Sequence, residues 1–355
     1  MKSRSLRTAA AATAAGLTLS LLPAAPAMAA TNADRADRAA DWEVTQLADA
    51  RINNVAYGFT DWGLTVDTYF GLVGADNHRK SARKVLRTVS EHVREYVSYR
   101  GDFYAGALAK TLLARRVGGL PAGVEQANLN LRRKLMSLIA GNGRVQDSGD
   151  TDYSNTITQS LAVLGLARSG ELPRLTARFL LRQQCEAGYF RLEMSAAGCD
   201  SDGGSADVDA TGYALQALRI ARRERGDVVP AGAISDAGAW LASEQKSNGA
   251  FNGSGPTAGA NTNSTGLAAQ ALSAVDRNGA ARQAADWIAR QQLTRSDTAG
   301  SPARKDLGAI AYNRADYEAA LSDGITRNKR DVWRRSTPQA ISGLDREPLS
   351  TLSAP

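Results

Sequence analysis

Three stretches of the chain consist almost entirely of small and apolar residues, and each follows a short polar segment. They are ITQSLAVLGL at 157–166, GYALQAL at 212–218 and GLAAQAL at 266–272. Helices that are apolar on nearly every side are typical of buried positions. The preceding Ser, Asn, Asp and Thr residues are those that cap helix N-termini by accepting hydrogen bonds from free amides. The pattern predicts three buried helices, each beginning at a polar cap.

These segments are copies of one repeat. Aligned on Thr156, Thr211 and Thr265, the copies recur at an almost constant spacing. Three further copies are weaker: Val66-Asp67-Thr68 before YFGLVG, YAGALAKTLL from Tyr104, and Ser336-Thr337-Pro338 before QAISGL. Repeats at a regular spacing are supersecondary units that bury their apolar faces only by stacking on their neighbours. The chain therefore contains six such units.

The segments between the buried helices carry charge, for example HRKSARKVLR at 78–87 and RIARRERG at 219–226. Buried helices that alternate with solvent-facing ones close naturally into an inner and an outer ring. We therefore expect an all-α fold, an (α/α)6 toroid of about six helical hairpins in a single domain over residues 41–345. An open α-solenoid is the alternative. Residues 30–40 are expected to be a loose N-terminus and residues 346–355 a C-terminal tail.

The N-terminal segment 1–29 has the features of a secretory signal peptide. A basic start with Lys2, Arg4 and Arg7 precedes an apolar run and the small-residue cleavage pattern Ala27-Met28-Ala29. The apolar run is too short for a membrane anchor, and no later segment is long and apolar enough to span a bilayer. The sequence therefore predicts a secreted protein, which we expect to be a monomer.

Removal of the signal peptide would lower the formal net charge from +7 to +4, which does not indicate nucleic-acid binding. Two cysteines in an exported protein typically form a disulfide, so we expect Cys185 to pair with Cys199. Two buried free thiols are the alternative. With two cysteines that pair with each other and two histidines, the chain lacks the four Cys or His ligands of a structural zinc site, and we expect no metal site.

A second signature resembles a known family. Gln184 to Phe190 and Gln245 to Phe251 follow a Q-x-x-x-G-x-F/Y pattern similar to the QW repeats of squalene and hopene cyclases, with Phe in place of Trp. Asp207-Val-Asp209-Ala-Thr211 resembles their DxDDTA acid motif. The resemblance spans most of 45–345, is sharpest in 175–292, and implies the α/α-toroid superfamily of terpenoid cyclases and protein prenyltransferases. That superfamily also includes cobalamin carriers and complement proteins.

The resemblance implies that Asp209, supported by Asp207, would be the catalytic acid of a class II-type terpene cyclase. The third aspartate of the motif is replaced by Ala210, and an Asp at a helix N-terminus is favoured as a carboxylate rather than as an acid. The prenyltransferase alternative would need a zinc site that His78 and His92 do not supply. Asp209 is therefore expected to be an N-cap, and the chain is expected to lack catalytic activity.

If the inner helices run parallel, their N-termini meet at one mouth of the barrel. The polar residues expected there are Asp67, Asp150, Asp152, Asp207, Asp209, Asn261 and Asn263. They would bind a small ligand or a partner, while the alternative is that they only cap helices and form turns. An isoprenoid or a corrinoid is suggested by the resemblance alone, and the third possibility is a carbohydrate-active (α/α)6 enzyme.

The run from Asp147 to Asp152 alternates oxygen-bearing side chains as a calcium loop does, although it lacks the turn glycine and the closing glutamate of the EF-hand. No cofactor is expected, with calcium as the alternative.

Overall fold

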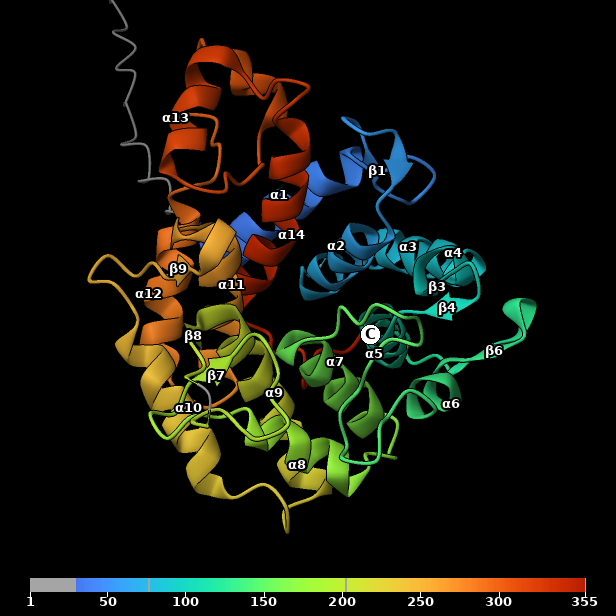
Figure 1. The fold of residues 1–355 in the computed structure, drawn as a ribbon. Helices are drawn as coiled ribbons and strands as arrows, with labels where there is room; N and C mark the ends of the chain where they lie inside the picture. Colours follow the sequence, from blue (N-terminus) through green and yellow to red (C-terminus); the bar gives the residue numbers. More distant parts are fainter. Residues whose placement is uncertain (1–29, 76, 202, 355) are drawn as a thin grey trace, which may run out of the picture. The chain divides into compact units, whose positions relative to one another are not determined.

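Six buried helices form a closed ring in the described part of the chain. The computed structural model describes residues 30–75, 77–201 and 203–354, so the signal peptide expected at 1–29 lies outside the described residues. The ring consists of α2 (Trp62–Gly74), α5 (Ala105–Val117), α7 (Thr156–Ala167), α9 (Val208–Glu224), α11 (Thr262–Ser273) and α14 (Arg330–Asp345). Each contacts the next, and α14 contacts α2 (Figure 1). The closed ring confirms the toroid and excludes the open solenoid.

A second set of helices packs around the ring. It consists of α1 (Asn32–Thr45), α3 (Arg79–Glu91), α6 (Leu131–Met136), α8 (Arg174–Arg182), α10 (Ala231–Ser243) and α12 (Asn278–Ala289). Each outer helix buries one face, whereas almost every residue of an inner helix such as α7 is buried. Two more helices, α4 (Val93–Val97) and α13 (Arg314–Asp323), lie outside this alternation.

Short antiparallel hairpins lie between helices, and four of them precede inner helices. They are β1–β2 (Asn53–Asn54, Phe59–Thr60), β3–β4 (Ser98–Tyr99, Asp102–Phe103), β5–β6 (Gly123–Val124, Leu129–Asn130), β7–β8 (Phe190–Arg191, Ala206–Asp207) and β9–β10 (Asn252–Gly253, Gly259–Ala260). The hairpin β5–β6 instead connects inner α5 to outer α6. In β7–β8, Phe190 lies opposite Asp207, the residue directly before α9. Four hairpins, all except β5–β6, thus lead the chain to the N-termini of inner helices.

The glutamines of the Q-x-x-x-G pattern fasten each turn to the following outer helix. Gln184 Nε2 donates to the carbonyl of Gly188 at 3.0 Å and to that of Ala233 in α10 at 2.8 Å. Gln245 repeats this with Gly249 and with Ala280 in α12. Since buried backbone carbonyls need donors, each glutamine satisfies two of them at once.

The last copy of this glutamine contact joins the turn at Gly308 to the N-terminal helix α1. Gln292 Nε2 donates to the carbonyl of Gly308 at 3.1 Å and to that of Arg35 at 2.7 Å. Arg35 belongs to α1, which therefore serves as the outer helix that follows α12. The expectation that residues 30–40 are loose is wrong, because Ala36, Ala39 and Ala40 are buried in this helix.

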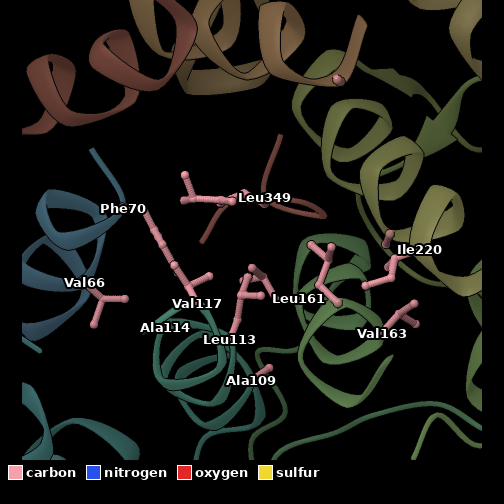
Figure 2. Packing of buried hydrophobic residues seen from close by; sticks show 14 of the residues in the cluster. Val66, Phe70, Ala109, Leu113, Ala114, Val117, Leu161, Val163, Ile220 and Leu349 are labelled. Carbon is pink, nitrogen blue, oxygen red and sulfur yellow. The ribbon is translucent and has the colours of Figure 1, made fainter. Parts of the chain in front are cut away.

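The C-terminal segment is also part of the fold. Arg168 donates to the carbonyls of Ser350 at 2.9 Å and Leu352 at 2.7 Å, and the Leu349 amide donates to Gln216 Oε1 at 2.8 Å. Leu349 is buried, and Figure 2 shows it between the helices that carry Phe70 and Leu161. Residues 346–354 are thus not a free tail, because they close one end of the barrel.

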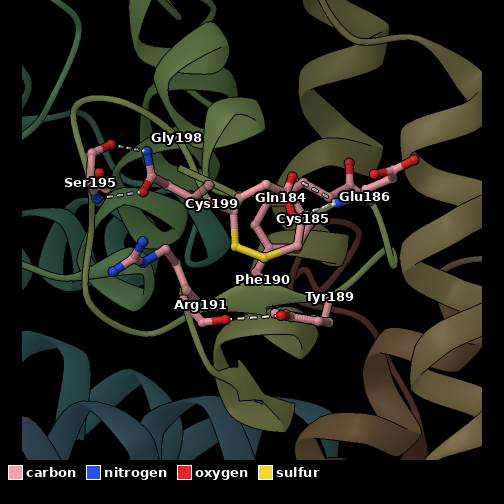
Figure 3. The surroundings of a disulfide bond; sticks show 12 residues. Gln184, Cys185, Glu186, Tyr189, Phe190, Arg191, Ser195, Gly198 and Cys199 are labelled. Carbon is pink, nitrogen blue, oxygen red and sulfur yellow. Dashed lines mark hydrogen bonds between the residues drawn. A yellow bond between two sulfur atoms is a disulfide. The ribbon is translucent and has the colours of Figure 1, made fainter. Parts of the chain in front are cut away.

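The disulfide between Cys185 and Cys199 is confirmed, with Cα atoms 4.8 Å apart (Figure 3). It closes the base of the loop that connects α8 to α9. Gln183 holds the same loop, since its Oε1 accepts from the Ser195 amide at 2.8 Å and its Nε2 donates to the Ser195 carbonyl at 2.9 Å. Within the described residues no helix is long and apolar enough to cross a membrane.

Replacing both cysteines by serine is expected to lower the free energy of unfolding by about 3 kcal/mol, because the crosslink restricts the unfolded chain. Urea unfolding of the wild-type and Cys185→Ser/Cys199→Ser proteins, each with and without reductant, measures the effect. The reductant should destabilise only the wild-type protein. Equal stabilities without reductant would show that the crosslink contributes nothing.

Candidate functional site

The inner helices share one direction, so their N-termini gather at one mouth. The C-terminal ends of α2, α5 and α14 line one cavity together with residues 351–354, and those of α9 and α11 line another together with residues 348–351. Arg168, which follows α7, holds the same C-terminal segment. The opposite end therefore collects the N-termini of the inner helices and the four hairpins that precede them.

Two of the residues expected at this mouth are N-caps. Asp207 Oδ1 accepts from the Ala210 amide at 2.6 Å, and Asn261 Oδ1 accepts from the Ser264 amide at 2.8 Å. Asp61 and Asn155 cap α2 and α7 in the same way. The cap of α9 is thus Asp207, and the expectation that Asp209 caps this helix is wrong.

Asp67 does not lie at the rim as expected. It occupies the interior of α2, and its Oδ1 forms an ion pair with Lys110 Nζ of α5 at 2.6 Å. The same Nζ donates to the Gly63 carbonyl at 3.0 Å. Both side chains are largely buried. Burial works to lower the pKa of Lys110, but the neighbouring Asp67 carboxylate and the Tyr96 and Tyr213 oxygens raise it above its usual value.

Asp209 lies two residues beyond the Asp207 cap, near Tyr213 of its own helix and Ser264 of α11. Burial raises the pKa of Asp209 to about 6, although the Ser264 hydroxyl lowers it, and the Asp207 carboxylate adds to the rise. Asp209 Oδ1, Asn263 Oδ1 and Ser264 Oγ are buried and have no hydrogen-bond partner among the described residues. The Ser264 hydroxyl is thus close enough to lower the pKa of Asp209, although the two groups do not form a hydrogen bond of good geometry.

The remaining predicted residues, Asp150 and Asp152, lie in the loop before α7. Asp150 is exposed, while Asp152 accepts from the Asp147 and Ser154 amides and from Arg144. Asp147 in turn accepts from the amides of Ala105 and Tyr153. These carboxylates stabilise loop backbone, and the described residues contain no cluster of metal-ligating side chains. The resemblance of this run to a calcium loop has no support in the geometry.

The space below the ion pair is small. A cavity of about 30 Å³ is lined by Asp67, Tyr213, Gln339 and other inner-helix residues, and by Leu349 of the C-terminal segment. A cavity of this size holds a few water molecules. A larger ligand would therefore have to bind above the ion pair, at the level of Asp209.

Four of the five tryptophans pack against groups other than Asp209. Trp42 and Trp333 pack in a separate cluster, Trp62 stacks on His92, and Trp240 packs against Tyr189. The aromatic residues that interact with Asp209 are Tyr213 and Tyr312. The surroundings of Asp209 are therefore phenolic and polar.

Comparison with solved structures agrees with this architecture. Neither a family profile nor a curated protein sequence matches the chain. A type II terpene cyclase from Scytonema, in complex with its product merosterolic acid A, has a TM-score of 0.55 and 15% identity, covering 89% of this chain and 97% of that one. The unsaturated glucuronyl hydrolase of Bacillus sp. GL1 has a TM-score of 0.55 and 11% identity, with coverages of 88% and 95%.

Haptocorrin in complex with Cbi (cobinamide) has a TM-score of 0.50 and 17% identity, covering 90% of this chain and 68% of that one. The chain has the α/α-toroid fold. At these identities the likeness establishes the fold and leaves the activity open, since one fold supports many functions.

Sequence reasoning missed Lys110, Tyr213 and Ser264 as members of the site. Lys110 interrupts the otherwise small and apolar run YAGALAKTLL, which is the signal that could have revealed it. A lysine in a helix buried on all sides needs an acidic partner, and Asp67 is the acid inside the neighbouring buried helix.

Proposed function

We propose that this chain is a secreted, non-catalytic toroid that holds a small ligand at the mouth of the barrel. The observation that carries the proposal is the group of three buried polar atoms without partners, Asp209 Oδ1, Asn263 Oδ1 and Ser264 Oγ. A buried polar atom without a hydrogen bond costs about 1–3 kcal/mol. A ligand with hydrogen-bonding groups would remove this cost at all three atoms.

The chemistry of the site favours a ligand with a polar face. Asp209 and Asn263 supply oxygens that accept hydrogen bonds, and Ser264 can donate or accept. Below them lie Tyr213 and the Lys110–Asp67 ion pair. The small cavity beneath prevents deep insertion, so the ligand would lie across the mouth. An isoprenoid would gain little from this surface, whereas a corrinoid or another ligand rich in amides and hydroxyls would fit its chemistry.

Native mass spectrometry of the protein purified from its own host tests this proposal. We expect a mass above that of the chain, retained under gentle conditions and lost on denaturation. The Asp209→Ala/Ser264→Ala variant should retain at least tenfold less ligand. Asp150→Ala, which removes an exposed loop carboxylate, is the matched control and should retain the ligand in full.

Two outcomes would refute the binding site. The native protein could carry no additional mass and show no binding to corrinoids or polyprenoids. Alternatively, Asp150→Ala could lose the ligand as completely as the Asp209→Ala/Ser264→Ala variant, which would place binding in the loop that carries Asp150.

A second candidate is a class II-type terpene cyclase with Asp209 as the acid. The raised pKa of Asp209 favours it, because a general acid must hold its proton near working pH. Its environment argues against it, since a cationic intermediate is stabilised best by aromatic faces, and the aromatic groups found to interact with Asp209 are the phenols of Tyr213 and Tyr312. Incubation with linear polyprenoids should give no cyclised product, and product that Asp209→Asn abolishes would make the cyclase the better account.

A carbohydrate-active enzyme is a weaker alternative. Most glycoside hydrolases use two carboxyl groups on either side of the bond they cleave. Near Asp209, the carboxylate of Asp67 is paired with Lys110, and that of Asp207 caps α9. These two carboxyl groups are therefore already engaged in contacts within the protein.

The disulfide supports the proposal that the protein is secreted, because such bonds persist in oxidising compartments. The test is the N-terminal sequence of the protein recovered from the culture medium. It should begin at Ala30, and an intact Met1 in the cell fraction alone would contradict secretion.

A further inference from the structure

A cavity of about 370 Å³ lies at the end of the barrel opposite the mouth. It is enclosed by the C-terminal half of α2, the first two turns of α3 and residues 351–354 of the C-terminal segment. Its volume is within the range of roughly 300–1,000 Å³ that small-molecule sites occupy. Nothing in the proposed function of the mouth uses it.

The lining of this cavity divides into an apolar floor and a basic wall. Leu72, Ala82, Leu86 and Leu352 contribute buried apolar side chains. Arg79 and Arg83 of α3 line one wall, and neither guanidinium has an ion-pair or hydrogen-bond partner within the described residues. Two like charges one helical turn apart repel one another, so an anion between them would stabilise the helix.

The start of α3 adds to the positive potential of this wall. The helix begins at Arg79, and no side chain caps its N-terminus. The unsatisfied amides of a helix N-terminus favour a bound anion. Asp345 and Glu347 also line the cavity, so an anionic group is favoured only beside the arginines of α3.

The hydroxyl of Tyr69 provides an independent indication of a ligand. Tyr69 lines the cavity, is 1% exposed, and its hydroxyl has no hydrogen-bond partner in the described part of the chain. A buried hydroxyl normally finds a partner. A ligand that fills the cavity would supply one.

We propose that this cavity binds an anionic amphiphile, a molecule with an acidic head group and an apolar body. The head group lies between Arg79 and Arg83, and the body lies on Leu72, Ala82 and Leu86. This site is separate from the mouth and does not depend on it.

Calorimetric titration of the full mature chain with decanoate tests the proposal, with decylamine as the cationic counterpart. We expect saturable binding of one decanoate per chain and at least tenfold weaker binding of decylamine. Arg79→Glu/Arg83→Glu should weaken decanoate binding at least tenfold. Arg87→Glu, one turn further along α3 and outside the cavity, is the matched control and should leave binding unchanged.

A second variant tests the apolar half of the site independently of charge. Val73 is half-buried and lines the cavity, so Val73→Trp should fill it and weaken decanoate binding at least tenfold without unfolding the chain, which circular dichroism checks. The proposal is wrong if decanoate shows no saturable binding, if decylamine binds as tightly, if Arg87→Glu weakens binding as much as the double variant, or if a folded Val73→Trp protein binds normally.

Discussion

Replacing Glu43 by glutamine is expected to stabilise the protein by an amount that grows with pH, to about 5 kcal/mol above pH 8. Glu43 lies in α1, is 0% exposed, and accepts one hydrogen bond, from Thr68 Oγ1 at 3.0 Å, while its Oε2 has no partner among the described residues. Burial raises the pKa of Glu43 from 4.5 to about 8, with Thr68 and then Arg334 opposing the rise.

The sign follows from proton linkage. The folded state holds the proton of Glu43 more tightly than the unfolded state does. This carboxyl group therefore leaves the free energy of unfolding of the wild-type protein undiminished below pH 4.5 and lowers it as the pH rises toward 8. Glutamine cannot ionise, so the variant should not show this loss. Urea unfolding of both proteins at pH 4.5 and pH 9 measures it, with the exposed Glu91→Gln as control. A difference between wild type and Glu43→Gln that is the same at both pH values would contradict the buried carboxyl.

Replacing Gly249 by alanine is expected to destabilise the protein by about 3 kcal/mol or more. Gly249 has φ +96°, a conformation that L side chains rarely adopt. A Cβ atom there would overlap the carbonyl oxygen of Gln283 and lie 2.8 Å from its carbonyl carbon, in the backbone of α12. The substitution would therefore separate the turn from the outer helix that Gln245 holds against it.

Gly279 provides the matched control for this variant. It lies in α12, and a Cβ atom there would meet nothing within 4 Å. Gly279→Ala should therefore be neutral or stabilising by up to about 1 kcal/mol. Urea midpoints of the two variants measure the contrast, and a Gly249→Ala protein as stable as Gly279→Ala would show that the turn does not need close packing.

The repeat was readable from the sequence because all inner helices share the same small, apolar composition, but its register was not. In the structure Thr211, Thr265 and Thr337 each accept the amide of the residue two positions after a repeat glycine. The equivalent acceptors in two other units are Thr65 and Gln159. Gln159 lies three residues from the Thr156 of the alignment, and Thr65 lies three residues from the Thr68 of a weaker copy. A shift of three residues keeps nearly the same helix face, so composition cannot distinguish the two registers.

The two ends of the fold were misjudged for a related reason. Residues 30–40 and 346–355 contain no copy of the repeat. Nevertheless α1 completes the outer ring, and Leu349 is buried at the centre of the inner ring. Their roles depend on partners far away in the sequence, such as Gln292 and Gln216, which a local pattern does not contain.

The site was predicted in part for the same physical reason. The caps Asp207 and Asn261 follow from local capping rules, which act within three residues. Asp67 and Lys110 meet only when two inner helices pack side by side. The burial of Asp209 likewise depends on α11, which begins only at Thr262, in the next repeat of the chain.

The most direct test of the account is a crystal structure of the protein purified from its own host, examined at the mouth of the barrel. We expect a bound molecule within hydrogen-bond distance of Asp209 Oδ1, Asn263 Oδ1 and Ser264 Oγ. A mouth that holds only solvent, with these three atoms paired to other protein groups, would contradict the ligand-binding function.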